Sequence, residues 1–142
     1  MNTAKSLVLK LVKVSTTFLF SLSILSFSAA TQANDVERLV MSLCEAAKAD
    51  DRSGMRKKLK TARLRLRNIY SGINCGPEGS LLRVATSSGS LDAATFIATK
   101  IGKENLSAAE SDGKNILQYA QDLVSAGDAS KQAFVDLYTS KM

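Results

Sequence analysis

Beyond residue 34, apolar residues recur at the 3.6-residue spacing of an α-helix, in short runs separated by turn residues. This part of the chain has little of the apolar–polar alternation that marks strands. It is rich in alanine, leucine, lysine and serine, and most of these favour helices. The helix breaker proline occurs once, as Pro77. The sequence therefore predicts an all-α fold of several short helices.

Capping residues and glycines set the predicted helix ends. Asn34 or Asp35 is expected to cap the first helix, and the pair Asp50 and Asp51 interrupts it and can cap the second. Gly102 ends a later helix. The predicted helices cover 35–49, a segment from Ser53, 80–87, 91–101, 114–124 with Asp112 as cap, and a last segment capped by Asp128.

Each predicted helix carries an apolar face that we expect to point into the core. These faces include Met55, Leu59 and Ala62 in the second helix, Leu91, Ala94, Phe96, Ile97 and Ile101 in segment 91–101, and Ala133, Phe134, Leu137 and Tyr138 in the last helix.

Two segments have no decisive pattern. In 63–73, continued helical spacing would extend the second helix, whereas the alternation of arginine and leucine also permits an extended arm. Glycine, asparagine and proline then impose a loop up to Gly79. Residues 103–113 are polar and predict a loop anchored by Leu106. The acidic residues Glu104, Glu110 and Asp112 of this loop are expected to be solvated.

Residues 1–33 have the three-part layout of a secretory signal peptide. A basic start is followed by an apolar stretch from 14 to 27 and a run of small residues from 28 to 33. The apolar stretch contains several serines and threonines and is shorter than the roughly 20 residues of a bilayer-spanning helix. The basic residues of the leader are Lys5, Lys10 and Lys13.

Cleavage is predicted after Ala33, with Ala30 as the second choice, which leaves a domain over residues 34–142. We expect this domain to be soluble, and periplasmic in a Gram-negative host or secreted. An uncleaved leader that acts as an anchor remains the alternative. Loss of the leader would lower the net charge from +6 to +3, because three lysines and no acidic residues lie within it.

Cys44 and Cys75 are the two cysteines of the chain. In an oxidising compartment, two lone cysteines in a small domain most simply form one disulfide. The alternatives are a reactive thiol or a metal pair, but two thiolates without histidine make a poor zinc site, and no Cys-x-x-Cys motif is present. We therefore predict a structural disulfide that ties the first helix to the loop before Gly79, with no metal and no cofactor.

Histidine is absent from the chain. This removes Ser-His and Cys-His activation of a nucleophile, imidazole proton transfer near neutral pH and histidine-ligated metals. Together with the absence of a recognisable catalytic motif, it predicts that the protein is not an enzyme and has no catalytic residues.

Residues 52–67 carry eight basic side chains and no acidic one. The simplest interpretation is a solvated helix face beside a core face. The sharper hypothesis is a face for an anionic partner such as lipid head groups, cell-wall polymers or an acidic protein. Nucleic acid is a poor partner because aromatic residues that could stack on bases are nearly absent there. The residues predicted for this face are Arg56, Lys57, Lys60, Arg63 and Arg67, which, apart from Lys57, would form one stripe on a continuous helix.

Residues 79–102, GSLLRVATSSGSLDAATFIATKIG, resemble an ankyrin repeat, and residues 112–138 repeat the scheme more loosely. Residues 43–59 are similar to a first repeat that enters at its Ala-Ala pair. This resemblance implies a short stack of antiparallel helix pairs, which in ankyrin proteins binds other proteins through loops and a concave face. The anchor alanines are Ala47, Ala85 and Ala120.

The block from LCEAAKADD to GSLLRVATSSG also resembles a small family of exported bacterial domains with two cysteines and no assigned function. The resemblance rests on Cys44, the basic segment, Asn74-Cys75 and the Ser-Leu-Leu that comes after them. The chain departs from the pattern after Cys75, where Gly-Pro-Glu-Gly stands in place of the expected Asn-Gly. The resemblance implies no activity.

These observations predict an exported, non-catalytic helical interaction module that binds a protein of the cell envelope. The alternative is a protein that binds an anionic surface or lipid through the basic residues 52–67.

Overall fold

The helical periodicity of the sequence is confirmed in a computed structural model that describes residues 29–142, with side chains described from Ala33 onward. The predicted leader lies largely outside the described residues. The chain divides into two units, Met1–Asp35 and Val36–Met142, and the second carries the fold. Across residues 29–142 there is no strand, and the α-helices are α1 (Ala29–Lys48), α2 (Arg52–Thr61), α3 (Leu66–Ile69), α4 (Leu81–Ser87), α5 (Leu91–Ile101), α6 (Lys103–Ser107), α7 (Ile116–Ser125) and α8 (Gln132–Lys141).

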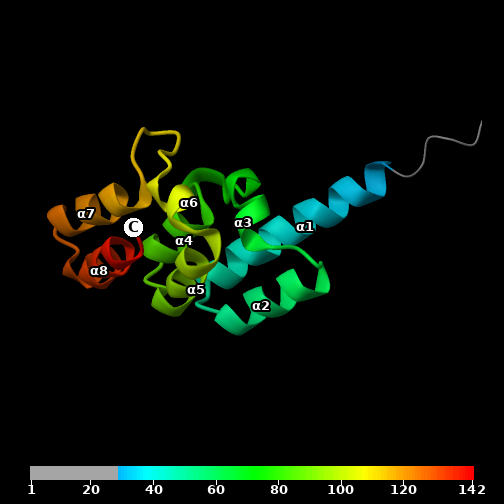
Figure 1. Cartoon of the computed structure of the whole chain (residues 1–142), viewed down its shortest axis with the longest axis horizontal. Coiled ribbons are helices and arrows are strands. Elements are labelled where there is room, and N and C mark those ends of the chain that lie inside the picture. Colours follow the sequence, from blue (N-terminus) through cyan, green and yellow to red (C-terminus); the bar gives the residue numbers. More distant parts are fainter. Residues whose placement is uncertain (1–28) are drawn as a thin grey trace, which may run out of the picture. The chain divides into compact units, whose positions relative to one another are not determined.

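Helix α5 is the centre of the second unit and packs against α2, α3, α4, α6 and α8 (Figure 1). Its alanines Ala93, Ala94 and Ala98 are buried, as are Phe96 and Ile97. Small side chains let neighbouring helices approach closely. The bounds predicted for this helix are confirmed, but Leu91 is 39% exposed, so its predicted inward position is wrong. Leu91 is the first residue of α5 and stands at the end of the helix.

The helices around this centre include two contacting pairs, α4 with α5 itself and α7 with α8. A 2.7 Å hydrogen bond between the hydroxyl groups of Thr86 and Tyr138 joins α4 to α8 inside the core. Burial raises the pKa of Tyr138 well above its usual range, so its hydroxyl remains protonated. The anchor alanines Ala47, Ala85 and Ala120 are fully buried.

The turn after α1 fixes where α2 and α5 begin. Asp50 adopts a left-handed conformation (φ 57°), and its carboxylate accepts a 2.7 Å hydrogen bond from the amide of Ala93 in α5. Asp51 caps α2 by accepting from the amide of Gly54, as predicted. Asn34 and Asp35, by contrast, lie inside α1, because the alanine-rich residues before them continue the helix.

Helix α2 ends at Thr61, so segment 63–73 is neither a continued helix nor an extended arm. The amide of Leu64 donates to the carbonyl of Leu59, and the amide of Arg63 to that of Lys60. These two bonds form a Schellman motif with Arg63 in the left-handed position (φ 56°). Of the apolar face predicted for the second helix, Met55 and Leu59 are buried, but Ala62 is exposed, so its predicted inward position is wrong.

The segments after α5 differ from their predictions in detail. Residues 103–107 form α6 in the predicted loop, and Leu106 is buried there as expected. Asn115, not Asp112, caps α7 through a reciprocal capping box with Gln118. Asp128 caps a 3-10 turn that leads into α8, and Ala133 in α8 is exposed instead of inward.

A disulfide joins Cys44 in α1 to Cys75 in the loop before Gly79, which confirms the predicted pairing. A disulfide of this kind fits an oxidising compartment. The loop between the cysteines includes α2, α3 and all of residues 52–67. No helix in the part of the chain that the structure describes is both long and apolar enough to cross a bilayer.

We expect the double variant Cys44→Ala/Cys75→Ala to lose about 3–4 kcal/mol of unfolding free energy, because opening a loop of this length restores the conformational freedom of the unfolded chain. Urea denaturation of oxidised wild type, reduced wild type and the variant measures it. Reduction should shift the wild-type midpoint and leave the variant unchanged. Equal midpoints for oxidised and reduced wild type would contradict a stabilising bridge.

Candidate functional site

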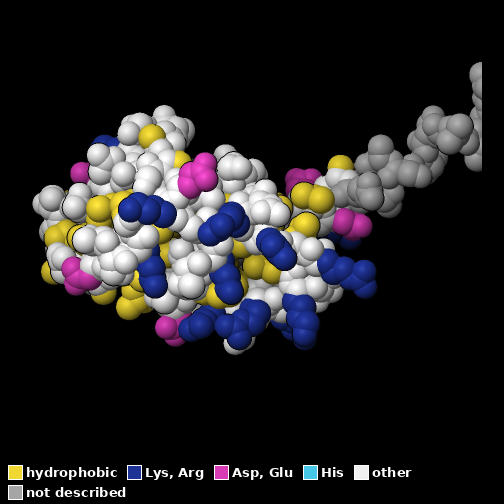
Figure 2. All heavy atoms as spheres, in the orientation of Figure 1, with side chains coloured by type: hydrophobic (Ala, Val, Ile, Leu, Met, Phe, Trp, Pro, Cys, Tyr) yellow, Lys and Arg dark blue, Asp and Glu magenta, His cyan; other side chains and the backbone are white. Residues whose placement is uncertain are grey.

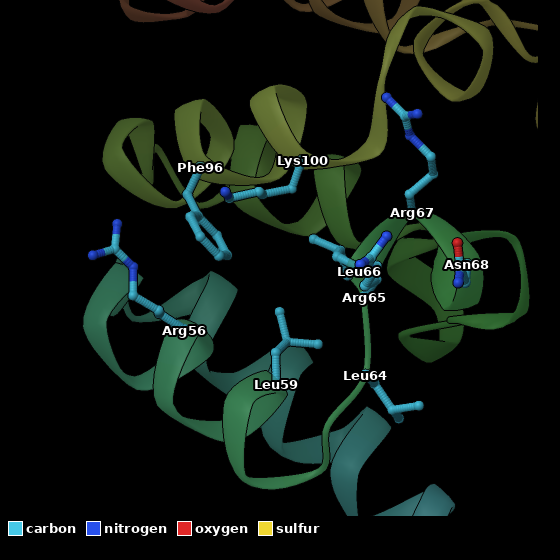
Figure 3. A pocket seen from close by; sticks show the side chains of 9 residues that line it. All are labelled: Arg56, Leu59, Leu64, Arg65, Leu66, Arg67, Asn68, Phe96 and Lys100. Carbon is cyan, nitrogen blue, oxygen red and sulfur yellow. The ribbon is translucent and has the colours of Figure 1, made fainter.

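A groove of about 640 Å³ lies between α2, the turn after it, α3 and α5 (Figure 3). Leu59 of α2, Leu66 of α3 and Phe96 of α5 supply its apolar floor, and all three side chains are largely buried. Leu64, in the turn, adds an exposed apolar edge. This floor forms because the Schellman turn ends α2, and the chain continues as the separate helix α3, which packs against α5.

Cations surround this floor. The basic side chains of Arg56, Arg65, Arg67 and Lys100 line the groove, and Asn68 is its one neutral polar side chain. The guanidinium of Arg56 lies 6.0 Å from the centroid of the Phe96 ring, within the range of a cation–π contact. No carboxylate lines the groove, so its charge is uniformly positive.

Arg67 occupies the place that a side chain at position 102 would need. Gly102 has a φ of +81°, and a Cβ built on it would lie 2.5 Å from an Nη of Arg67. Glycine therefore serves two purposes here: it permits the left-handed turn between α5 and α6, and it leaves room for the guanidinium.

The basic segment 52–67 has no acidic counterpart. None of its eight basic side chains forms an ion pair with a carboxylate of the described residues, whereas Lys48, Arg83, Lys114 and Lys131 all do. Figure 2 shows Lys and Arg side chains gathered over α2 and its neighbours, with hydrophobic atoms between them and few acidic side chains. The basic side chains of this segment are therefore outside the ion pairs of the described residues, although Asp51 lines the same hollow as Lys57 and Lys58.

The five residues predicted to form one basic face lie in different places in the structure. Arg56 and Arg67 line the groove, although from different helices. Lys57 lies on another flank of α2, beside a second hollow that also contains Lys58. Lys60 is exposed on α2 away from both hollows, and Arg63 is exposed in the turn. The continuous stripe requires a single helix, and α2 ends before Arg63.

Among the groove residues that sequence reasoning does not assign to a binding face are Arg65, Phe96 and Lys100. Arg65 belongs to the basic segment, but it lines the groove only because the turn after α2 redirects the chain. The sequence predicts Phe96 as core and gives no signal for Lys100. Only the packing of α5 against α2 and α3 brings these two residues to the basic segment, and no local pattern encodes that contact.

Arg83 in α4 forms a second cluster with acidic residues of the loop before α7. Its Nη1 and Nη2 donate to the two carboxylate oxygens of Asp112 at 2.8 and 2.7 Å, and its guanidinium lies 4.6 Å from the centroid of the Tyr119 ring. Its Nε is 3.0 Å from Glu110 Oε2. The hydrogen bond from Arg83 holds the pKa of Asp112 well below its usual range.

Glu110 extends this cluster to the start of α4. It accepts a 2.6 Å hydrogen bond from the hydroxyl of Ser80, the N-cap of α4, and Tyr70 donates to the same Ser80 oxygen at 3.3 Å. Burial raises the pKa of Tyr70 to about 12, which keeps it a donor. Both Glu110 and Asp112 are thus paired with Arg83. Asp112 is exposed, as is Glu104, so the expected solvation is confirmed for these two residues and is wrong for the half-buried Glu110. We interpret the cluster as a structural tie between α4 and the loop before α7.

Candidate metal ligands do not gather in the described part of the chain, where no group of three or more Cys, Asp or Glu side chains could hold an ion. The geometry therefore defines a helical, disulfide-bonded domain whose distinguishing site is a cationic groove with an apolar floor.

Residues 43–110 match the model of a protein family described as "Protein of unknown function (DUF3718)". This segment runs from the residue before Cys44 to Glu110, so it contains the disulfide, the basic segment and helices α2–α6. This part of the chain is similar to that family and is helical, which agrees with the expected resemblance to a two-cysteine family without an assigned function. No curated protein and no solved structure matches the chain.

We expect Arg83→Met to lower the unfolding free energy by about 2 kcal/mol, because it removes charge-assisted hydrogen bonds and leaves Glu110 half-buried without its cation. Urea denaturation at neutral pH measures the change. Arg38→Met, at an exposed arginine of α1, is the matched control and should change stability little. Equal midpoints for the two variants would contradict a structural role for the cluster.

The pH dependence of stability tests Asp112 separately. Because its pKa is lower in the folded protein, the stabilisation is present above the unfolded pKa of about 3.9 and is lost as pH falls through the folded value. The stability difference between wild type and Asp112→Asn should therefore narrow from about pH 5 to about pH 2. A constant difference over this range would contradict the ion pair.

Proposed function

We propose that this protein is a non-catalytic binding module of the cell envelope that engages an anionic partner through residues 52–67. The observation that carries the proposal is the uncompensated charge: eight basic side chains in 16 consecutive positions make no ion pair with the described carboxylates. A face of this kind attracts anions over distances near a Debye length.

The sequence of the leader and the disulfide support a location in the cell envelope. The layout of residues 1–33 is typical of a signal peptide, with cleavage proposed after Ala33 or Ala30, and the disulfide fits the oxidising periplasm or the extracellular space. Lipid head groups and anionic cell-wall polymers are abundant anions in such a setting. The absence of histidine in the sequence favours binding over catalysis as the proposed role.

A protein partner is the second candidate. The segments that resemble ankyrin repeats fold as the helix pairs α4–α5 and α7–α8, and their anchor alanines are buried. Ankyrin-like stacks bind proteins through their loops and concave face. This candidate rests on analogy of fold, whereas the anionic partner is inferred from the charges of the face itself.

Vesicle binding tests the proposal. The oxidised protein should bind phosphatidylglycerol vesicles, bind phosphatidylcholine vesicles much more weakly, and lose affinity as salt rises. The triple variant Arg56→Glu/Lys60→Glu/Arg63→Glu should bind at least about 100-fold more weakly, since each basic residue near such a surface contributes about 1 kcal/mol.

The control is Arg38→Glu/Lys103→Glu/Lys141→Glu, which makes the same change in net charge at exposed positions outside the basic segment. It should retain most of the affinity. Equal losses in the two variants would show that net charge alone drives binding, and unchanged binding of the first variant would refute the proposed face.

A further inference from the structure

Resting on that proposed function, we infer that the groove between α2, α3 and α5 binds a single-chain amphiphile that ends in a carboxylate or phosphate. Its apolar chain lies on the floor, and its anionic head lies at the cationic rim. The observation behind this is the pairing of a buried apolar floor with a rim of four cations and no carboxylate.

The floor accounts for the chain. Leu59, Leu66 and Phe96 come from three different helices and converge on the hollow, as Figure 3 shows. Burying a methylene group of a ligand against such side chains stabilises the complex through the hydrophobic effect. The groove volume of about 640 Å³ falls among the volumes of sites for small ligands.

The rim accounts for the head. Arg56 from α2 and Lys100 from α5 flank the Phe96 ring on opposite walls of the groove (Figure 3). An anionic head at the edge of the Phe96 ring that reached both cations would gain two charge-assisted contacts. Arg65 adds a third cation at the end of the groove formed by α3.

Donor and acceptor chemistry favours this ligand over an acidic peptide. Arginine and lysine only donate hydrogen bonds, and Asn68 is the one lining side chain with a good acceptor oxygen. A peptide would bring backbone N–H groups that need acceptors, whereas a carboxylate or phosphate brings acceptors alone. A hydrocarbon chain needs neither. The groove therefore matches an anionic amphiphile on both its polar and its apolar parts.

Calorimetric titration with dodecyl phosphate and with dodecanoate, each below its critical micelle concentration, tests the inference on the oxidised protein. Both should bind, and inorganic phosphate and dodecyltrimethylammonium should bind far more weakly. Each methylene removed from the alkyl phosphate should weaken binding by up to about fourfold.

Two variants of α2 locate the site. Arg56 and Lys60 are both exposed and lie one helical turn apart, but only Arg56 lines the groove. Arg56→Glu should weaken binding of dodecyl phosphate at least about 10-fold, and Lys60→Glu, with the same change in charge, by a clearly smaller factor, because it acts only through the general positive field. Lys100→Glu should repeat the effect of Arg56→Glu from the opposite wall. Circular dichroism and urea midpoints confirm that each variant is folded.

Each other outcome overturns the inference in a different way. Equal losses of affinity for Arg56→Glu and Lys60→Glu would show that binding depends on the overall positive charge of α2 and not on the groove. If the protein bound anionic vesicles but neither dodecyl ligand, the basic face would be assigned to a membrane surface. If it bound poly-glutamate but neither dodecyl ligand nor anionic vesicles, the face would be assigned to an acidic protein. In these cases the proposed anionic partner would stand, whereas failure to bind anionic vesicles, amphiphiles and poly-glutamate alike would refute both.

Discussion

The packing of α5 is the constraint on which the rest of the structure depends. Five helices contact it, and they can do so because Ala93, Ala94 and Ala98 present almost no side-chain volume. Larger residues at these places would overpack the core, at a typical cost of about 1–3 kcal/mol. The carboxylate of Asp50 also binds the amide of Ala93, so the turn between α1 and α2 is oriented by the same helix. The basic segment is positioned through this turn.

A helix end created the groove. Arg63 takes the left-handed position that glycine usually fills, so α2 stops and α3 begins as a short helix in contact with α5. A continuous helix would have kept the basic side chains on one straight stripe. The break instead places Arg56 and Arg67 around a hollow with an apolar floor, together with Lys100 from α5. The left-handed arginine is strained by roughly 1 kcal/mol, which two backbone hydrogen bonds at the helix end offset.

Features encoded locally were predictable from the sequence, and features created by packing were not. The all-α class, the bounds of α5, the Asp51 cap and the cysteine pairing each depend on neighbouring residues or on a simple count. The left-handed Arg63 has no sequence signal, because the Schellman position normally favours glycine. Asp112 looked like a helix cap, and its contact with Arg83, 29 residues earlier, depends on how α4 meets the loop before α7.

The disulfide makes residues 44–75 a covalent ring, and the whole basic segment lies within it. Lysines and arginines are the residues after which trypsin-like proteases cut, and this ring contains many of them on its surface. A single cut inside the ring opens it but does not divide the molecule, because both ends stay joined through sulfur. The segment with the highest density of trypsin target residues is therefore also one where a single cut releases no fragment.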